Sequence, residues 1–133
     1  MLELSDIRRW RFVLLGILAS FGMLWFMDYL LPEAQSSFVG MYGRSAVKWV
    51  IAFSVGGLVA GRWFLVPAVA SAMLLVGGIV VHTAYLAGLY GQPVLPVLTN
   101  NLPILAITSA GAAIGASIGM WFAGKVRRDA EVA

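Results

Sequence analysis

The chain has 133 residues, of which 61% are hydrophobic and only 11% are charged, whereas soluble domains average about 25% charged residues. A domain of this size has too much surface for its volume to hide so many apolar side chains, so the composition excludes an ordinary soluble protein and favours one that lipid surrounds. The net charge of +3 does not indicate nucleic acid binding, because the basic residues lie at the edges of apolar segments, where membrane proteins keep them. The chain has no cysteine, which excludes disulfides, thiolate metal sites and a cysteine nucleophile.

The first apolar segment predicts a membrane-spanning helix over residues 10–31. Its uncharged part covers residues 12–27, and Pro32 follows, which cannot continue a helix because it lacks the backbone N–H. A signal peptide also combines basic residues with an apolar stretch, but this stretch is long for one and no good cleavage site follows it. We therefore interpret the segment as a helix that is retained.

The second predicted helix, residues 45–65, has a short uncharged centre. Trp49 to Gly61 gives only 13 uncharged residues, whereas a helix needs about 20 residues to cross a bilayer. Lys48 and Arg62 are therefore expected to extend their charged ends toward opposite membrane interfaces. The preceding segment, residues 32–44, is polar and is predicted to be a surface loop.

The third and fourth predicted helices lie within a stretch of 62 residues, 63–124, that contains no Asp, Glu, Lys or Arg. Pro67 is expected in the first turn of the third helix, residues 67–90, where its missing N–H costs nothing. Three of the five prolines fall in residues 91–103, which predicts a non-helical connection along the membrane surface. The fourth helix is predicted over residues 102–124, with a frayed polar tail after it.

These segments together predict an all-α fold, an integral membrane four-helix bundle that forms a single transmembrane domain over residues 1–133. Lysine and arginine concentrate on the cytoplasmic side of membrane proteins, and four spans would put seven of the nine on one side. The seven are Arg8, Arg9, Arg11, Arg62, Lys125, Arg127 and Arg128, and the other two are Arg44 and Lys48. We therefore predict a multi-pass protein of the inner (cytoplasmic) membrane with both termini in the cytoplasm.

The second and fourth helices share a short sequence pattern. Ser54-Val55-Gly56 matches Ser117-Ile118-Gly119, and Ala60-Gly61-Arg62 matches Ala123-Gly124-Lys125, with an offset of 63 residues in both cases. Because both helices would run toward the cytoplasm, the pattern is consistent with two parallel repeats of a helical hairpin. Coincidence within the small alphabet of membrane segments is the alternative interpretation.

Glycines four residues apart suggest close helix packing, because they form a groove that lets another backbone approach. The candidate packing residues are Gly57, Gly61, Gly111, Gly115 and Gly119. They could pack helices within one chain or hold copies or partner subunits together, and the sequence does not separate these readings.

A polar set near the outer interface forms the second candidate site: Asp28, Lys48 and His82. Ionisable groups in membrane segments are costly and often functional, so a proton or ion role is one interpretation. The other is that water solvates all three side chains at the level of the lipid headgroups. One histidine beside one aspartate is far short of a metal site, so we predict neither a metal nor a cofactor.

The sequence contains no G-x-S-x-G, H-E-x-x-H or P-loop motif, and we predict no catalytic residues and no enzyme. We expect a non-catalytic membrane subunit that assembles through its glycine-rich helix faces. Its expected partners are the lipid bilayer and either further copies of itself or other membrane subunits. The alternative is a small homo-oligomeric transporter or channel, including a holin-like pore former.

One short stretch resembles a known family. Arg11-Phe12-Val13-Leu14-Leu15-Gly16, followed by Asp28, is similar to the opening of GtrA-type proteins. The resemblance implies a four-span fold and a role in moving lipid-linked sugars. That family ends its second and fourth helices with Asn-Arg-aromatic, where this chain has Gly61-Arg62-Trp63 and Gly124-Lys125-Val126. No functional residue is carried over.

Overall fold

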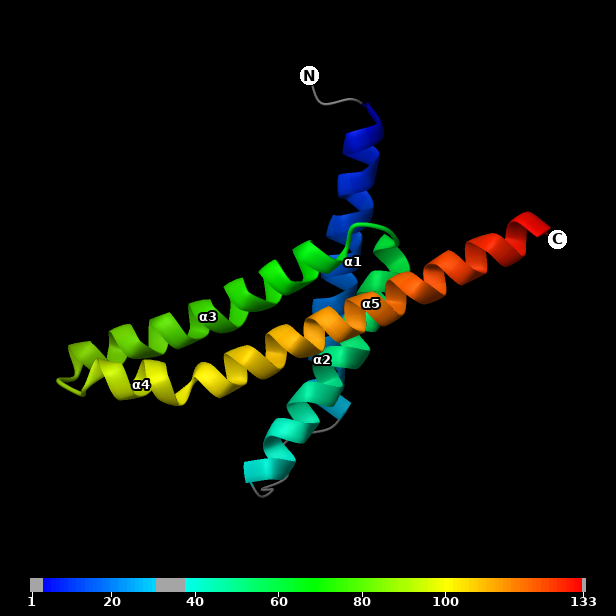
Figure 1. The fold of residues 1–133 in the computed structure, drawn as a ribbon. Helices are drawn as coiled ribbons and strands as arrows, with labels where there is room; N and C mark the ends of the chain where they lie inside the picture. Colours follow the sequence, from blue (N-terminus) through cyan, green and yellow to red (C-terminus); the bar gives the residue numbers. More distant parts are fainter. Residues whose placement is uncertain (1–3, 31–37, 133) are drawn as a thin grey trace.

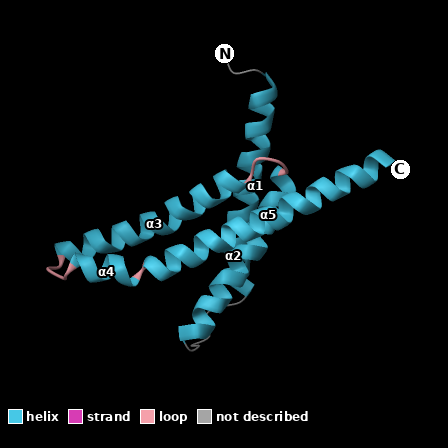
Figure 2. Ribbon diagram, in the orientation of Figure 1, coloured by secondary structure: helices cyan, strands magenta, loops and turns pink. Residues whose placement is uncertain are grey.

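The computed structural model describes residues 4–30 and 38–132, which form helices joined by short turns and contain no β-strand (Figures 1 and 2). The all-α prediction is confirmed for this part of the chain. The helices are α1 (Leu4–Leu30), α2 (Phe38–Ala60), α3 (Leu65–Leu89), α4 (Val94–Asn100) and α5 (Leu102–Val132).

Among the described residues, three stretches are long and apolar enough to cross a membrane: Asp6–Leu30, Leu65–Leu89 and Val94–Val132, the last of which runs through α4 and α5. At 23 residues, α2 also has the length of a span. It is not among the three, because Arg44 and Lys48 dilute the apolar content of its first half. Helices of spanning length and hydropathy are thus shown, and the count of four spans stays a prediction.

The helices form two antiparallel hairpins that cross each other (Figure 1). One hairpin is α1 with α2, and the other is α3 with α4 and α5. The crossing is made by α2 and α5, which share the most extensive helix contact in the structure and run in the same direction (Figure 1). The start of α1, the α2–α3 turn and the end of α5 consequently lie on the same side of the crossing.

An aromatic cluster fills the centre of the α1–α2 hairpin. Phe53 and Phe64 are fully buried. The Phe53 ring stacks on Trp49, with ring centroids 5.4 Å apart, and meets Phe21 edge-on at 5.9 Å. The remaining core consists mostly of alanines, which keep the helices close together: Ala52, Ala60, Ala68, Ala72, Ala112 and Ala116.

The end of α2 differs from the predicted boundary at residue 65. The helix stops at Ala60 because Gly61 adopts a positive φ of 68° and its N–H donates a 2.9 Å bond to Gly57 O, which is a common way to end a helix. The helix also begins earlier than predicted, at Phe38.

The prediction that residues 91–103 contain no helix is wrong. Pro93 caps α4, Pro96 lies in its first turn, and Pro103 is the second residue of α5. All three occupy positions where a helix has no internal partner for the backbone N–H, so they start helices here and do not break them. The tail was also predicted to fray, yet α5 continues to Val132, with Lys125 Nζ 5.7 Å from the centre of the Trp121 ring.

Candidate functional site

The glycines of α5 lie directly on the backbone of α2. A Cβ on Gly115 would overlap Val50 O, and a Cβ on Gly119 would overlap Ser54 O. A Cβ on Gly111 would lie 2.9 Å from Trp49 Cβ. The backbones therefore approach so closely that only glycine fits at these positions, and this face of α5 is covered within the chain.

Of the two candidate glycines near the end of α2, only Gly57 belongs to this contact. A Cβ on Gly57 would lie 2.6 Å from Ala116 O. Gly61 lies beyond the end of α2, where its positive φ forms the turn into α3. Its role is thus conformational, because an L side chain rarely adopts this backbone geometry.

A second close contact, between α1 and α2, was not among the predicted packing sites. A Cβ on Gly16 would lie 2.7 Å from Gly56 O, and a Cβ on Gly56 would overlap Ser20 Oγ. The Ser20 hydroxyl donates a 2.9 Å bond to Gly16 O, which satisfies it inside the contact. The signal was present in the sequence as two pairs of small residues four apart, Gly16 with Ser20 and Gly56 with Ala60.

The α2–α5 crossing follows the same offset as the sequence pattern. Ser54 lies against both Gly115 and Gly119, and the residue 63 positions after Ser54 is Ser117, midway between these two glycines. A parallel pair of repeats would meet in this register, although the duplication itself stays a prediction.

The predicted polar set separates into a bonded pair and a single residue. Lys48 Nζ donates a 2.6 Å charge-assisted bond to Asp28 Oδ1, joining α1 to α2. The Lys48 side chain is 15% exposed and that of Asp28 is 64% exposed. His82 is exposed on α3 and forms no hydrogen bond or ion pair with any other described residue. The structure therefore does not bring the three together as one site.

We expect Asp28 and Lys48 to be energetically coupled and His82 to be independent of both. In a double-mutant cycle of Asp28→Asn and Lys48→Met, the coupling should be about 1 kcal/mol, the upper range for a pair with one well-exposed partner. The measurement is unfolding in mild detergent by titration with a denaturing detergent. A cycle of Asp28→Asn with His82→Ala should give no coupling, and coupling as large as that of the lysine pair would contradict this assignment.

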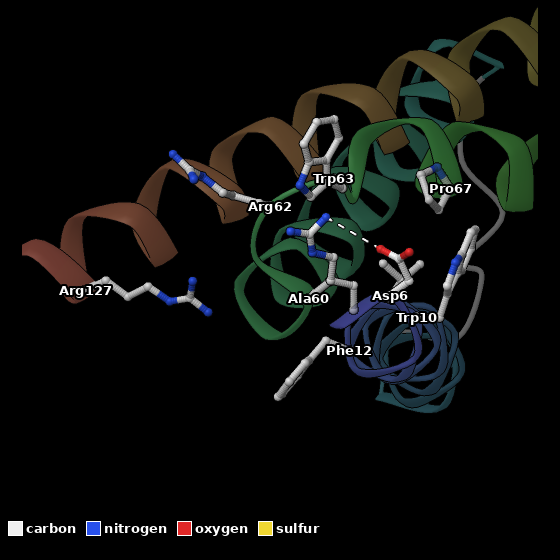
Figure 3. Close-up of a pocket in the computed structure, with 10 residues that line it drawn as sticks. Asp6, Trp10, Phe12, Ala60, Arg62, Trp63, Pro67 and Arg127 are labelled. Carbon is white, nitrogen blue, oxygen red and sulfur yellow. Dashed lines mark ion pairs between the residues drawn. The ribbon is translucent and has the colours of Figure 1, made fainter. Parts of the chain in front are cut away.

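A basic cavity of about 530 Å³ lies where the start of α1, the α2–α3 turn and the end of α5 meet (Figure 3). Its polar lining consists of three arginines and one aspartate, and its remaining walls are aromatic and apolar. The lining residues are Asp6, Arg9, Trp10, Phe12, Val13, Ala60, Arg62, Trp63, Pro67 and Arg127. Sequence analysis placed the arginines on one side of the protein but did not predict a cavity, because its walls come from three distant segments.

The α2–α3 turn directs Arg62 and Trp63 to this cavity. Trp63 has a φ of 73°, in the left-handed region that a bulky residue rarely adopts. Such a conformation costs about 1–3 kcal/mol and is kept only where surrounding structure imposes it. Here Gly61 before it also has a positive φ, and the buried Phe64 after it anchors the chain in the aromatic core.

The charges of the cavity are incompletely balanced. Arg9 Nη1 lies 3.8 Å from Asp6 Oδ1, one turn earlier in α1 (Figure 3). Neither Arg62 nor Arg127 forms an ion pair with any residue in the described part of the chain. A Cβ on Gly61 would lie 3.7 Å from Arg127 Nη2, which places this guanidinium against the turn. Three arginines and one aspartate leave a formal charge of +2 in the lining.

The described residues contain no group of three or more His, Cys, Asp or Glu side chains that could hold a metal ion. They define an all-helical protein with three stretches suited to cross a membrane. No protein-family model matches the chain, and no solved structure matches it. The likeness of residues 11–28 to GtrA-type proteins therefore does not extend to a family match.

Proposed function

We propose that this chain is a non-catalytic subunit of the inner membrane, with both termini in the cytoplasm, that assembles with further copies of itself. The sequence analysis assigned assembly to the glycines of α2 and α5. Because those glycines are covered within the chain, we assign the assembly surface to α3.

The observation that carries the proposal is the outward face of α3. Leu74, Gly78, Val81 and Tyr85 recur at helical spacing on this face, and the three large side chains are 77%, 63% and 63% exposed. A Cβ on Gly78 would meet nothing within 4 Å. Glycine inside a helix costs about 0.5–1 kcal/mol relative to alanine, and the single chain gains no packing from it.

A second helix packed on this face could approach closely at Gly78, because small residues let helix backbones come together in lipid. A second copy of this chain is the occupant we propose, since most oligomers are formed by identical subunits related by a twofold axis. An axis along the membrane normal would keep the basic ends of both copies on the same side. This agrees with the orientation expected from the distribution of arginine and lysine.

Cysteine cross-linking tests this proposal cleanly because the chain has no cysteine of its own. Leu74→Cys and Val81→Cys, made singly and oxidised in membranes, should each give a disulfide-linked dimer. Leu18→Cys is the matched control, because Leu18 is equally apolar and exposed but lies on α1. Dimerisation at Leu18 as efficient as on α3 would show random collision and would contradict the proposal.

A disruptive variant supplies the second measurement. Gly78→Leu leaves the fold of one chain unobstructed, but it should weaken self-association about tenfold or more, since overpacking a contact costs about 1–3 kcal/mol. Light scattering in mild detergent measures this change. Self-assembly would be ruled out if the wild-type protein were strictly monomeric in detergent and neither α3 cysteine variant cross-linked in membranes.

The alternative of a small homo-oligomeric transporter or channel rested on the possible 63-residue repeat and on a pair between Asp28 and His82. Asp28 is bonded to Lys48 instead, and no other observation favours transport, so we do not propose that function.

A further inference from the structure

The cavity at the basic end of the molecule has a composition suited to an anionic ligand. Arg62 and Arg127, which form no ion pair among the described residues, lie 65 positions apart in the sequence and line the same cavity only through the fold. Figure 3 shows them on one side of the cavity, with Trp10 and Pro67 on the other. The single acid in the lining, Asp6, is already paired with Arg9.

From this arrangement we infer that the cavity binds a phosphate group that carries a small organic substituent. Guanidinium groups match phosphate geometry, because their planar N–H donors can bond two phosphate oxygens at once. Neither arginine has an acid partner in the described part of the chain, so these donors are available to a ligand. The inference goes beyond the proposed function, because the self-assembly face of α3 contributes no residue to this cavity.

The rest of the lining specifies what accompanies the phosphate. Trp10 and Trp63 contribute aromatic rings to the lining, while Val13, Ala60 and Pro67 provide an apolar wall. A ligand with a charged head and an apolar or glycerol-like continuation would therefore be accommodated along its whole length. The volume of about 530 Å³ lies within the ordinary range of ligand sites, about 300–1,000 Å³.

Two sources supply such a ligand: the headgroup of an anionic phospholipid and a soluble phosphate ester. Tryptophan and arginine are the side chains that membrane proteins place at the lipid interface, and the cavity lies at the ends of membrane-spanning stretches. In both ligands the phosphate would be bound by the arginines. The experiment therefore has one arm for each source.

The lipid arm uses the intact protein in nanodiscs of phosphatidylcholine with increasing fractions of phosphatidylglycerol. Native mass spectrometry should show retained phosphatidylglycerol, and thermal unfolding should shift upward with its fraction. The soluble arm adds glycerol 3-phosphate or inorganic phosphate to protein in phosphatidylcholine alone and measures the same shift. A response in one arm identifies the source, while no response in either arm overturns the inference.

Arginine variants show whether the response comes from this cavity. Arg62→Gln and Arg127→Gln should each weaken binding about tenfold, since each removes a charge-assisted hydrogen bond to the phosphate. Arg128→Gln is the matched control, because it removes the same charge from the next residue of α5, which does not line the cavity. Circular dichroism verifies that each variant keeps its helices. Equal losses in Arg128→Gln and Arg127→Gln would reduce the effect to general surface charge and overturn the site.

Discussion

Replacing Gly119 with alanine is expected to lower the free energy of unfolding by about 2 kcal/mol. This net value is the destabilisation from overpacking minus the stabilisation from the higher helix propensity of alanine. The added Cβ would overlap Ser54 O and lie 2.7 Å from Leu58 N. Both obstructing atoms belong to the backbone of α2, so no side chain can move aside to relieve the overlap. The two helices have to separate along their contact, and the loss should appear in detergent-induced unfolding and in the melting temperature.

Gly124→Ala is the matched control on the same helix. A Cβ on Gly124 would meet nothing within 4 Å, so this change should be neutral or stabilising by up to about 1 kcal/mol, the difference in helix propensity. The opposite signs at two positions five residues apart are the diagnostic result. Equal stability of the two variants would mean that α2 and α5 do not meet at Gly119.

Phe53→Ala is expected to destabilise the protein by about 3 kcal/mol, the lower end of the range for such truncations. Phe53 is fully buried between Trp49, Phe64 and Phe21, so its removal leaves a cavity at the centre of the α1–α2 hairpin. In a bilayer the ring would also lie in an apolar environment when it is not packed against other helices. The loss therefore comes from dispersion contacts and aromatic pairing more than from transfer out of water.

Phe26→Ala is the matched control for the loss of packing contacts. Phe26 lies in the same hairpin but is 50% exposed. Its removal should cost much less than that of Phe53 in the same unfolding titration. If the two variants were equally destabilised, the aromatic cluster would not be the packing centre of this hairpin.

Helix positions were predictable to the extent that they depend on local sequence. The uncharged stretch from Trp63 to Gly124, with Arg62 and Lys125 at its edges, identified apolar helices, because lipid and water separate such residues regardless of tertiary contacts. Residues 91–103 were misinterpreted because three prolines within 13 residues suggested disruption. Their exact positions at the starts of two helices decide the outcome, and composition alone does not carry that information.

Part of the candidate site could also be read from sequence. Four-residue glycine spacing indicated close packing, but the partner of each glycine depends on which helices meet. Gly16 and Gly56 were missed because each pairs with a serine or alanine rather than with another glycine. Asp28, Lys48 and His82 were expected near one interface, but which of them meet depends on the direction in which α3 leaves the crossing.

The sequence by itself determined that this protein is helical and rich in segments suited to a membrane, because hydropathy and charge act over neighbouring residues. The tertiary structure alone decided that the glycine faces are internal, that α3 keeps an open face, and that Arg62 and Arg127 line one cavity. These outcomes depend on how two hairpins cross, and the crossing is set by close contacts between residues about 60 positions apart.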